Sequence, residues 1–284
     1  MNNPIFLAVI GGSGVYQFPA LKNVEKIEID TPFGKPSSAI VIGDLHGKKV
    51  AFLARHGEGH VLTPTEVNYR ANIYALKKVG AKRIVSISAC GSLREDYAPG
   101  DFVIPHQLFD FTKDRKRSFF GDGVVAHIGS ADPYCEDLRS QVIQAIKQTD
   151  TTVHDAGTYI TIEGPRFSTK AESNLFREWG MSVIGMTACP EAFLAREAGI
   201  CYATMAHVTD YDVWHVSEKP VTVEMVVKVA HKNTERAKKA VQNLIDILPP
   251  VSHCECWNSL KNAVLTDSKR IPDKTKENID LLFR

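Results

Sequence analysis

The sequence predicts an α/β protein: a single domain with a central mixed, largely parallel sheet flanked by helices. Three observations lead to this fold class. Apolar runs rich in β-branched residues recur along the chain, helix start and stop signals lie between them, and the strand and helix patterns alternate. Such alternation favours parallel pairing through right-handed crossovers, with helices covering the sheet.

Short apolar runs are expected to form the buried strands of this sheet. Runs of this length without polar alternation are typical of strands that are covered on both faces. They span residues 6–10, 50–54, 83–88, 159–162, 183–186 and 202–208.

Capping residues mark the expected helices. The segment 63–66, Thr-Pro-Thr-Glu, places a cap, a proline at the first helical position and a glutamate at the third, so we expect a helix from here to Gly80. The same signals predict helices over 169–180 and 190–199. Apolar residues at helical spacing predict one long amphipathic helix over 221–248, ended by two prolines.

A single domain is expected over residues 1–284, because a chain of 284 residues buries roughly 75% of its unfolded surface and needs no disulfide or metal to stabilise its core. The segment 249–284 is richer in Lys, Asp and Asn and carries a short helical pattern over 257–265. It is the candidate substrate lid, since loops of this kind vary and carry function.

Charge and composition restrict the class of partner. The chain has 34 Lys and Arg against 33 Asp and Glu, a net charge of +1, which excludes a strong field for nucleic acid or an anionic membrane. We therefore expect a small-molecule partner. The first apolar run stops at Gly11, too early for a signal core or a spanning helix, which favours a cytoplasmic location with reduced thiols.

A glycine-rich turn follows the first predicted strand. In Gly11-Gly12-Ser13-Gly14, backbone N–H groups can approach an anion closely and the Ser13 hydroxyl can donate as well, so a phosphate loop is expected. A dinucleotide fingerprint would need a third glycine where Gln17 stands. A plain glycine turn is the alternative.

Arg55 and His56 end the second of these strands, where side chains of α/β folds meet ligands. The planar fork of Arg55 suits phosphate. His56 and His60 also have the spacing of a helical metal site, but Gly57 and Gly59 disfavour a helix, so we expect no metal.

Three further strands also end in residues that can contact a ligand. Ser88 and Cys90 follow one of them, and Cys90 is interpreted either as a nucleophile or as a buried structural cysteine. Met186 and Thr187 end another, offering a flat apolar surface beside a hydroxyl. Glu163 and Arg166 end a third, where they either serve the site or pair with each other.

Two carboxylates end the last predicted strand. Asp210 and Asp212 stand at alternate positions, so both are expected to project the same way. A protonated or shared carboxyl group can donate to a purine N7 while its other oxygen accepts from an exocyclic amine. A solvated turn is the alternative.

Several long motifs occur in one order between about residues 9 and 214: GGSG, DTPFGKPS, FLARHG, NYRANIYALK, SACGSLRE, PGDFVIP, TIEGPRFST, GMTACPEAFLAREAGICYA and VTDYDVW. Together they resemble the 5'-methylthioadenosine phosphorylases of the trimeric nucleoside phosphorylase family. The resemblance implies cleavage of the N-glycosidic bond of 5'-methylthioadenosine by inorganic phosphate, giving adenine and 5-methylthioribose 1-phosphate in purine and methionine salvage. Phosphate is then a co-substrate, and no cofactor is expected.

The resemblance also implies roles for single residues. The implied phosphate site consists of Ser13, Arg55, His56, Ser88, Ala89 and Thr187. Met186 is the implied floor under the ribose, and Asp210 and Asp212 recognise the base with Phe167, Ser168 and Thr209 nearby. Asp210, Asp212 and His56 are the expected catalytic residues.

The methylthio pocket is similar to one built from His60, Val223, Val226 and, across a subunit boundary, His127. A homotrimer is therefore expected, with a hexamer as the alternative. Some relatives from hyperthermophiles carry disulfides, and the pairs Cys254–Cys256 and Cys135–Cys201 are similar to these.

Other functions are compatible with parts of the sequence. A phosphorylase for 6-oxopurines typically needs an Asn at the position of Asp210, and His60 can instead hydrogen-bond a 5'-hydroxyl. A dinucleotide-dependent oxidoreductase, a zinc hydrolase built on His56 and His60, and a nucleoside-sensing protein are the alternatives from other classes.

Overall fold

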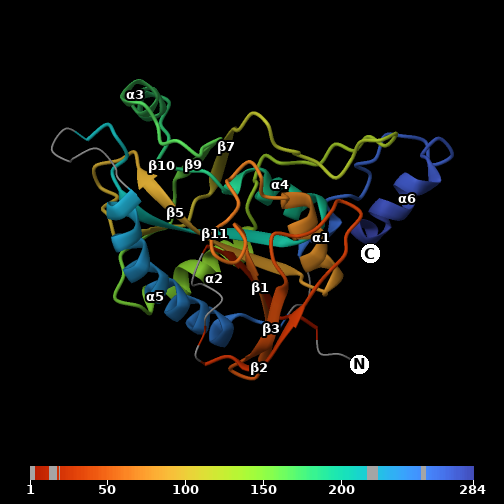
Figure 1. Cartoon of the computed structure of the whole chain (residues 1–284), viewed down its shortest axis with the longest axis horizontal. Helices are drawn as coiled ribbons and strands as arrows, with labels where there is room; N and C mark the ends of the chain where they lie inside the picture. The colour runs from red at the N-terminus through yellow and green to blue at the C-terminus, as the bar shows by residue number, and fades with distance from the viewer. Residues whose placement is uncertain (1–3, 13–17, 19, 216–222, 251–253) are drawn as a thin grey trace.

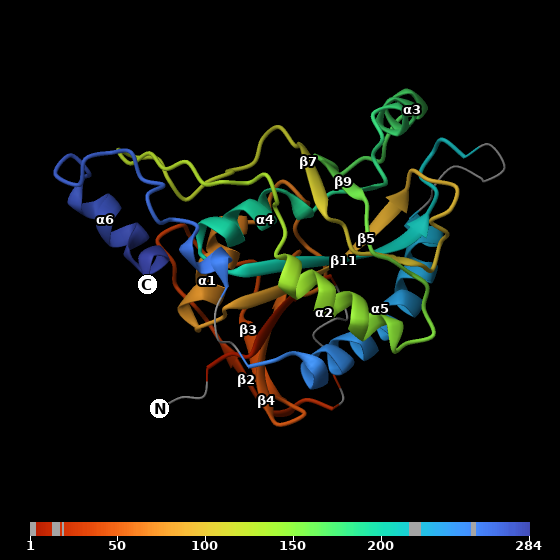
Figure 2. The same ribbon diagram turned by 180° about the vertical axis from the view of Figure 1, so that it is seen from behind.

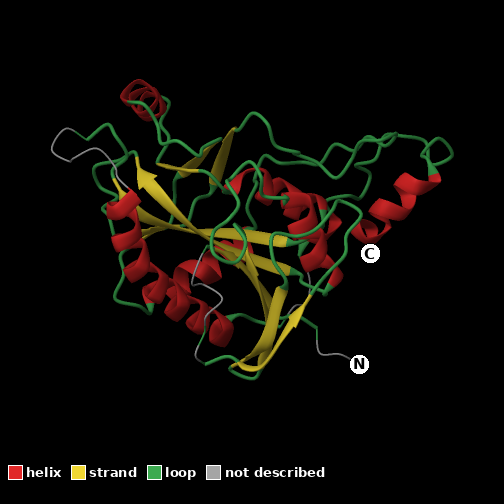
Figure 3. Ribbon diagram, in the orientation of Figure 1, coloured by secondary structure: helices red, strands yellow, loops and turns green. Residues whose placement is uncertain are grey.

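A computed structural model describes residues 4–12, 18, 20–215, 223–250 and 254–284, without the side chains of 223–226 and 228. One eleven-stranded sheet runs through the molecule and helices lie around it (Figure 3). The strands are β1 (Leu7–Gly11), β2 (Lys22–Ile27), β3 (Ile40–Leu45), β4 (Lys48–Ala54), β5 (Arg83–Ser92), β6 (Phe102–Val103), β7 (Gln107–Phe111), β8 (Val153–His154), β9 (Thr158–Ile162), β10 (Val183–Gly185) and β11 (Cys201–Asp210).

The sheet is mixed and largely parallel, which confirms the predicted fold class. Its main path runs β2-β3-β4-β1-β5-β10-β9-β7, while β11 pairs with β5 and β6, and β6 pairs with β8. Parallel pairs join β1 to β4 and β5, β5 to β11, β9 to β7 and β10, and β6 to β8. The antiparallel pairs are β2–β3, β3–β4, β5–β10 and β6–β11.

Helices cover the sheet on both sides. They are α1 (Tyr69–Lys78), α2 (Glu136–Lys147), α3 (Lys170–Glu178), α4 (Ala188–Glu197), α5 (Val223–Ile247) and α6 (Asp273–Ile279), with short 3₁₀ turns η1 (Glu255–Asn258) and η2 (Asp280–Phe283). Figure 1 and the reverse view in Figure 2 both show α2 and α5 on one side of β11 and α1 and α4 on the other, with α3 and α6 away from the centre.

Two hydrophobic cores lie on opposite faces of the sheet. Alternate residues of β1 divide between them: Leu7 and Val9 pack in the core under α2 and α5, and Ala8 and Ile10 in the core under α1 and α4. All four side chains are fully buried. A strand buried on both faces needs apolar residues at every position, which explains why these runs show no alternation.

Most of the predicted boundaries are confirmed. Thr169 caps α3 through a complete capping box with Glu172. The predicted helix over 190–199 corresponds to α4, and the long amphipathic helix to α5. No helix in the described part of the chain is both long enough and apolar enough to cross a membrane.

The predicted start of the first helix is wrong. Glu66 accepts hydrogen bonds from the Thr63 backbone N (2.9 Å) and hydroxyl (2.7 Å), so the capping contacts form. They close only a turn, however, and α1 begins at Tyr69 after a separate cap, Asn68, whose side chain accepts from Ala71 N at 3.1 Å. Capping chemistry stabilises a turn whether or not a helix continues from it.

The carboxyl-terminal segment also differs from expectation. The pattern over 257–265 forms η1 and turns rather than a helix, and the helix of this region is α6, farther along the chain. Strands β2 and β3 and helix α2 were not predicted either. Five of the six residues of β2 are exposed, so this strand has no apolar run to mark it.

Candidate active site

The carboxyl ends of several strands meet at one cavity of about 710 Å³. Parallel pairing of β1, β4, β5 and β11 brings their ends to the same edge of the sheet. Among the residues that line the cavity are these members of the predicted site: Arg55, His56, His60, Ser88, Ala89, Phe167, Ser168, Met186, Thr187, Thr209, Asp210 and Asp212. Residues far apart in the sequence therefore share one site.

Arg55 extends from the end of β4 and is held by a carboxylate that we did not predict. Its Nε and Nη2 donate to the two carboxylate oxygens of Glu191 at 2.7 and 2.9 Å, and Nη2 also donates to the Ser86 hydroxyl at 2.6 Å. Burial by itself lowers the pKa of Arg55, but the charge and hydrogen bonds of Glu191 outweigh it, so the pKa is raised. The guanidinium stays charged and fixed.

One nitrogen of this guanidinium remains for a ligand. Nη1 makes a longer contact of 3.3 Å with the carbonyl oxygen of Ile87. We expected the bidentate fork of Arg55 to face phosphate, but it faces Glu191. The Oε1 of Glu191 also accepts from the Tyr202 hydroxyl at 2.8 Å. Glu191 appeared in the sequence only as a helix-start residue, and its full burial is the signal of a paired charge.

His56 is a neutral hydrogen-bonding group at pH 7. Burial and the charge of Arg55 lower its pKa to about 4. Its Nδ1 lies 2.9 Å from the carbonyl oxygen of Leu62, which can only accept, so Nδ1 carries the hydrogen and Nε2 keeps a lone pair. The rings of His56 and His60 stack with centroids 4.4 Å apart.

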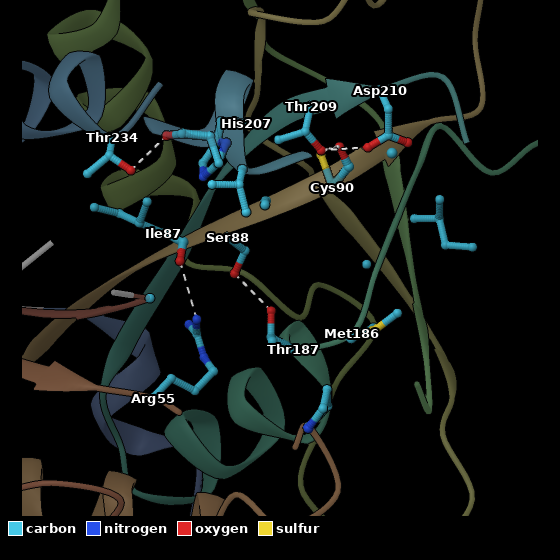
Figure 4. Close-up of a pocket in the computed structure, with 18 of the residues that line it drawn as sticks. Arg55, Ile87, Ser88, Cys90, Met186, Thr187, His207, Thr209, Asp210 and Thr234 are labelled. Carbon is cyan, nitrogen blue, oxygen red and sulfur yellow. Dashed lines mark hydrogen bonds between the residues drawn. The ribbon is translucent and has the colours of Figure 1, made fainter. Parts of the chain in front are cut away.

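Two hydroxyl groups meet beside Arg55. The Oγ of Ser88, on β5, lies 2.9 Å from the Oγ1 of Thr187, which stands directly before α4. Figure 4 shows this contact between Arg55 at one end of the labelled residues and Asp210 at the other. The guanidinium and the two hydroxyl groups provide donors for an anion, and the imidazole provides an acceptor for a protonated oxygen of it.

Met186 is positioned by its backbone and by a glycine. Arg115, whose side chain is 0% exposed, donates to the carbonyl oxygens of Met186 (2.7 Å) and Cys189 (2.6 Å). A Cβ on Gly164 would lie 2.5 Å from the Met186 sulfur, and its φ of +69° favours glycine in any case. The thioether therefore has a fixed place in the cavity wall.

Glu163 and Arg166 do not pair with each other, contrary to one of the two interpretations. Glu163 accepts from the Lys113 backbone N at 2.5 Å and pairs with Arg115 at 3.4 Å, and its pKa is lowered to about 2 because these bonds outweigh burial. Arg166 pairs with Glu172 at 2.6 Å. Glu163 thus supports Arg115 behind Met186.

The far end of the cavity holds the two carboxylates. Asp210 is fixed by the Thr209 hydroxyl at 2.6 Å and by the backbone N of Asp212 at 2.8 Å. The hydroxyl of Thr209 also lies 3.2 Å from the Cys90 carbonyl oxygen, and the shorter distance favours donation to the carboxylate. Asp212 has a φ of +52°, so the chain makes a turn directly after β11.

Two polar atoms at this end lack a hydrogen-bond partner among the described residues. They are the Oδ2 of Asp212 and the Oγ of Ser168, both buried and both on residues that line the cavity. Burial raises the pKa of Asp212 to about 6 and also raises that of Asp210. A buried polar group without a partner costs about 1–3 kcal/mol, so both atoms are suited to a polar ligand.

The remaining candidates from the sequence are Cys90, Ser13, Val223, Val226 and His127. Burial raises the pKa of Cys90 well above its ordinary value, which favours the interpretation as a buried structural cysteine. Ser13 lies outside the described residues, as do the side chains of Val223 and Val226. His127 is exposed, and its backbone N donates to the Ala263 carbonyl at 2.9 Å.

One face of α5 contributes to the cavity and was not predicted as a whole. Its lining residues are Val227, Ala230, His231, Thr234, Glu235 and Lys238. The amphipathic pattern of this helix indicated an apolar face toward the core, and the polar residues next to that face gave no sign of a ligand. His207, also in the lining, has a pKa lowered to about 4 by burial.

Comparison with known proteins identifies the group to which this arrangement belongs. Residues 6–246 match the family model described as the phosphorylase superfamily. The chain is 50% identical over 278 residues to an S-methyl-5'-thioadenosine phosphorylase of Geobacter sulfurreducens, covering 98% of this chain and 97% of that protein. It is 53% identical over 263 residues to the enzyme of the same name from Hyperthermus butylicus, covering 91% and 95%.

Solved structures agree. A methylthioadenosine phosphorylase from an antarctic soil metagenomic library superposes with a TM-score of 0.93 at 45% identity, covering 99% of this chain and 100% of that one. The methylthioadenosine phosphorylase of Schistosoma mansoni, solved in complex with adenine, gives a TM-score of 0.82 at 35% identity, covering 98% and 97%.

Proposed function

This chain belongs to the phosphorylase superfamily, and from that premise we propose that it catalyses the phosphorolysis of 5'-methylthioadenosine. The bond from C1' of the ribose to N9 of adenine breaks, and a bond from C1' to a phosphate oxygen forms. Adenine leaves with a proton, and 5-methylthioribose 1-phosphate is the second product. The enzyme is therefore a pentosyltransferase.

The observation that carries this function is a single cavity with anion-binding groups at one end and a buried carboxyl pair at the other (Figure 4). An oxocarbenium-like ribosyl cation between them needs a phosphate nucleophile on one side of C1'. It needs a proton or hydrogen-bond donor for the base on the other. Fixed donors in a partly dry site supply most of such catalysis by position and electrostatics.

The phosphate site is assigned to Ser13, Arg55, His56, Ser88, Ala89 and Thr187. What supports this is the charged Nη1 of Arg55 and the pair of hydroxyl groups on Ser88 and Thr187. The neutral Nε2 of His56 suits a protonated phosphate oxygen, which donates to it, and ionised oxygens are left to the other donors.

The base site is assigned to Asp210 and Asp212, with Thr209, Phe167 and Ser168 around them. Burial raises the pKa of both carboxyl groups, which eases protonation, and a protonated carboxyl group can donate to N7 as negative charge grows on the base. The Oδ2 of Asp212, buried and without a partner among the described residues, suits the 6-amino group of adenine as an acceptor. A 6-oxopurine presents acceptors at both N7 and O6, so it would offer the Oδ2 of Asp212 no hydrogen to accept.

The rest of the substrate lies between these ends. Met186 forms the floor under the ribose, and His60, Val223 and Val226 surround the methylthio group. His127 of the partner subunit completes this pocket, so the active form is an oligomer, and the resemblance to the trimeric family favours a homotrimer. The balanced reaction changes no oxidation state, so inorganic phosphate is the sole co-substrate and no cofactor takes part.

Release of free base tests the proposal. Methylthioadenosine, adenosine, inosine and methylthioinosine are each incubated with and without phosphate. Phosphate-dependent release of adenine, fastest from methylthioadenosine, is the expected result. Preference for inosine or methylthioinosine would overturn the role of Asp210, and release without phosphate would overturn phosphorolysis itself.

The oligomer has its own test. Light scattering gives the mass of the assembly, for which three chains are expected. The His127→Ala variant should raise KM for methylthioadenosine more than KM for phosphate. An active monomer would contradict the assignment of His127.

A further inference from the structure

Four cysteines from three distant segments meet away from the active site. Cys135 stands directly before α2, Cys201 begins β11, and Cys254 and Cys256 flank the start of η1. Their sulfur atoms all lie within 4.8 Å of one another. Three of these thiols are buried and Cys254 is half-buried.

The spacing of the sulfurs matches a tetrahedral metal shell. A Zn²⁺ ion bound to thiolates at about 2.3 Å in a tetrahedron holds its sulfurs about 3.8 Å apart. The Sγ atoms of Cys135 and Cys254 are 3.7 Å apart. Disulfide sulfurs lie about 2.0 Å apart in separate pairs, whereas here all four share one shell.

The charges around the cluster favour thiolates. The Nη1 of Arg196 lies 3.5 Å from the Cys256 sulfur, and Arg83 is close enough to Cys135, Cys201 and Cys254 to interact with them electrostatically. A divalent ion with four thiolates carries a net charge of −2, which two guanidinium groups balance, whereas disulfides carry none.

We propose that Cys135, Cys201, Cys254 and Cys256 form a structural Zn²⁺ site. Four protein ligands leave no open position for water or substrate, which distinguishes this site from a catalytic one. Binding releases the remaining thiol protons to solvent and involves no change of oxidation state. The one-residue spacing of Cys254 and Cys256 is shorter than that of common zinc motifs, so the fold rather than the motif brings the ligands together.

The site ties the beginning of the carboxyl-terminal segment to the body of the protein. Cys201 and the proposed catalytic Asp210 stand at opposite ends of β11, so the metal is remote from the reaction. Beyond Cys256 the segment pairs with the loop that carries His127, through an Ala126–Val264 bridge and the His127–Ala263 hydrogen bond. Zinc binding therefore stabilises the surface that presents His127.

Metal analysis of the full chain tests the site. The protein is purified in reductant from zinc-supplemented medium, or reconstituted with Zn²⁺ and dialysed, and its zinc content is measured by mass spectrometry. One zinc per chain is expected. Replacement by Co²⁺ should give the intense visible absorption of tetrahedral thiolate coordination, together with a sulfur-to-cobalt charge-transfer band.

Variants locate the ligands. Cys201→Ser should lose the bound zinc and lower the midpoint of thermal unfolding, whereas Cys189→Ser, which removes a buried thiol outside the cluster, should keep one zinc per chain. If Cys201→Ser does not fold, the zinc content and cobalt spectrum of the wild type still decide. Zinc well below one per chain after reconstitution overturns the site. So does a denatured wild-type protein in which only Cys90 and Cys189 react as thiols, because two disulfides then occupy the cluster.

Discussion

Arg55 and Glu191 stand 136 residues apart in the chain and form a bidentate buried ion pair, with N–O distances of 2.7 and 2.9 Å. Their side chains are 2% and 0% exposed. A pair this deeply buried contributes little net stability compared with apolar residues, but removing one partner is costly. Its value lies in holding a cation at the proposed phosphate site.

Glu191→Gln should lower the free energy of unfolding by about 3–5 kcal/mol, because it leaves the Arg55 charge buried without a counter-charge. Saturating phosphate should raise the urea midpoint of this variant more than that of the wild type, since the anion then replaces the carboxylate. Glu277→Gln, which breaks an exposed pair with Lys274, is the control and should change stability by less than about 1 kcal/mol. Equal costs for the two variants would contradict the role of Glu191.

Asp210→Ala should reduce kcat for methylthioadenosine by roughly 10²–10⁴-fold, the range typical of a lost general acid. The fold should survive, because Asp210 bonds only local groups, the Thr209 hydroxyl and the Asp212 backbone. Steady-state rates and thermal unfolding are measured together. Asp132→Asn, which alters an exposed carboxylate, is the control. If the fall in rate is explained by a matching fall in the folded fraction of Asp210→Ala, Asp210 has a structural role instead.

Asp212→Asn tests the cost of a buried carboxylate. Its pKa rises from the ordinary 3.8 to about 6 on folding, so the folded state prefers the protonated form. The contribution of this group to the free energy of unfolding is therefore complete below about pH 4. It falls by on the order of 3 kcal/mol as the pH rises to about 6. The variant should lack this fall and be more stable than the wild type at pH 8, yet less active. Urea unfolding across this pH range gives the difference curve, and parallel curves would contradict the prediction.

His56→Gln tests the opposite sign. The pKa of His56 falls from 6.5 to about 4 on folding, so the folded state prefers the neutral ring. The contribution of this group to the free energy of unfolding, on the order of 3 kcal/mol, is present above pH 6.5 and is lost as the pH falls to about 4. The free energy of unfolding of the variant should fall less steeply as the pH is lowered. Its KM for phosphate should be higher than that of the wild type. A pH dependence of stability equal to that of the wild type would contradict this prediction.

Six of the largely buried strands, β1, β4, β5, β9, β10 and β11, could be predicted, because a strand that is covered on both faces needs apolar residues at every position. The runs at 83–88 and 202–208 correspond to β5 and β11, which lie side by side at the centre. Strand β2 could not be predicted, because an exposed edge strand is stabilised by pairing with β3 rather than by its own apolar residues. The start of α1 was missed for a similar reason, since local capping contacts at Thr63 do not show where packing begins.

The sequence by itself determined the α/β class, the central strands and the residue types gathered at strand ends, because hydrophobic periodicity and turn chemistry are local properties. Resemblance to known motifs then assigned twelve of the residues that line the cavity. Only the tertiary structure decided which charges meet: Glu191 with Arg55, Glu163 with Arg115, and four cysteines in one cluster. Such contacts depend on the packing of segments more than a hundred residues apart or on buried distances of a few ångströms, and neither leaves a periodic trace in the chain.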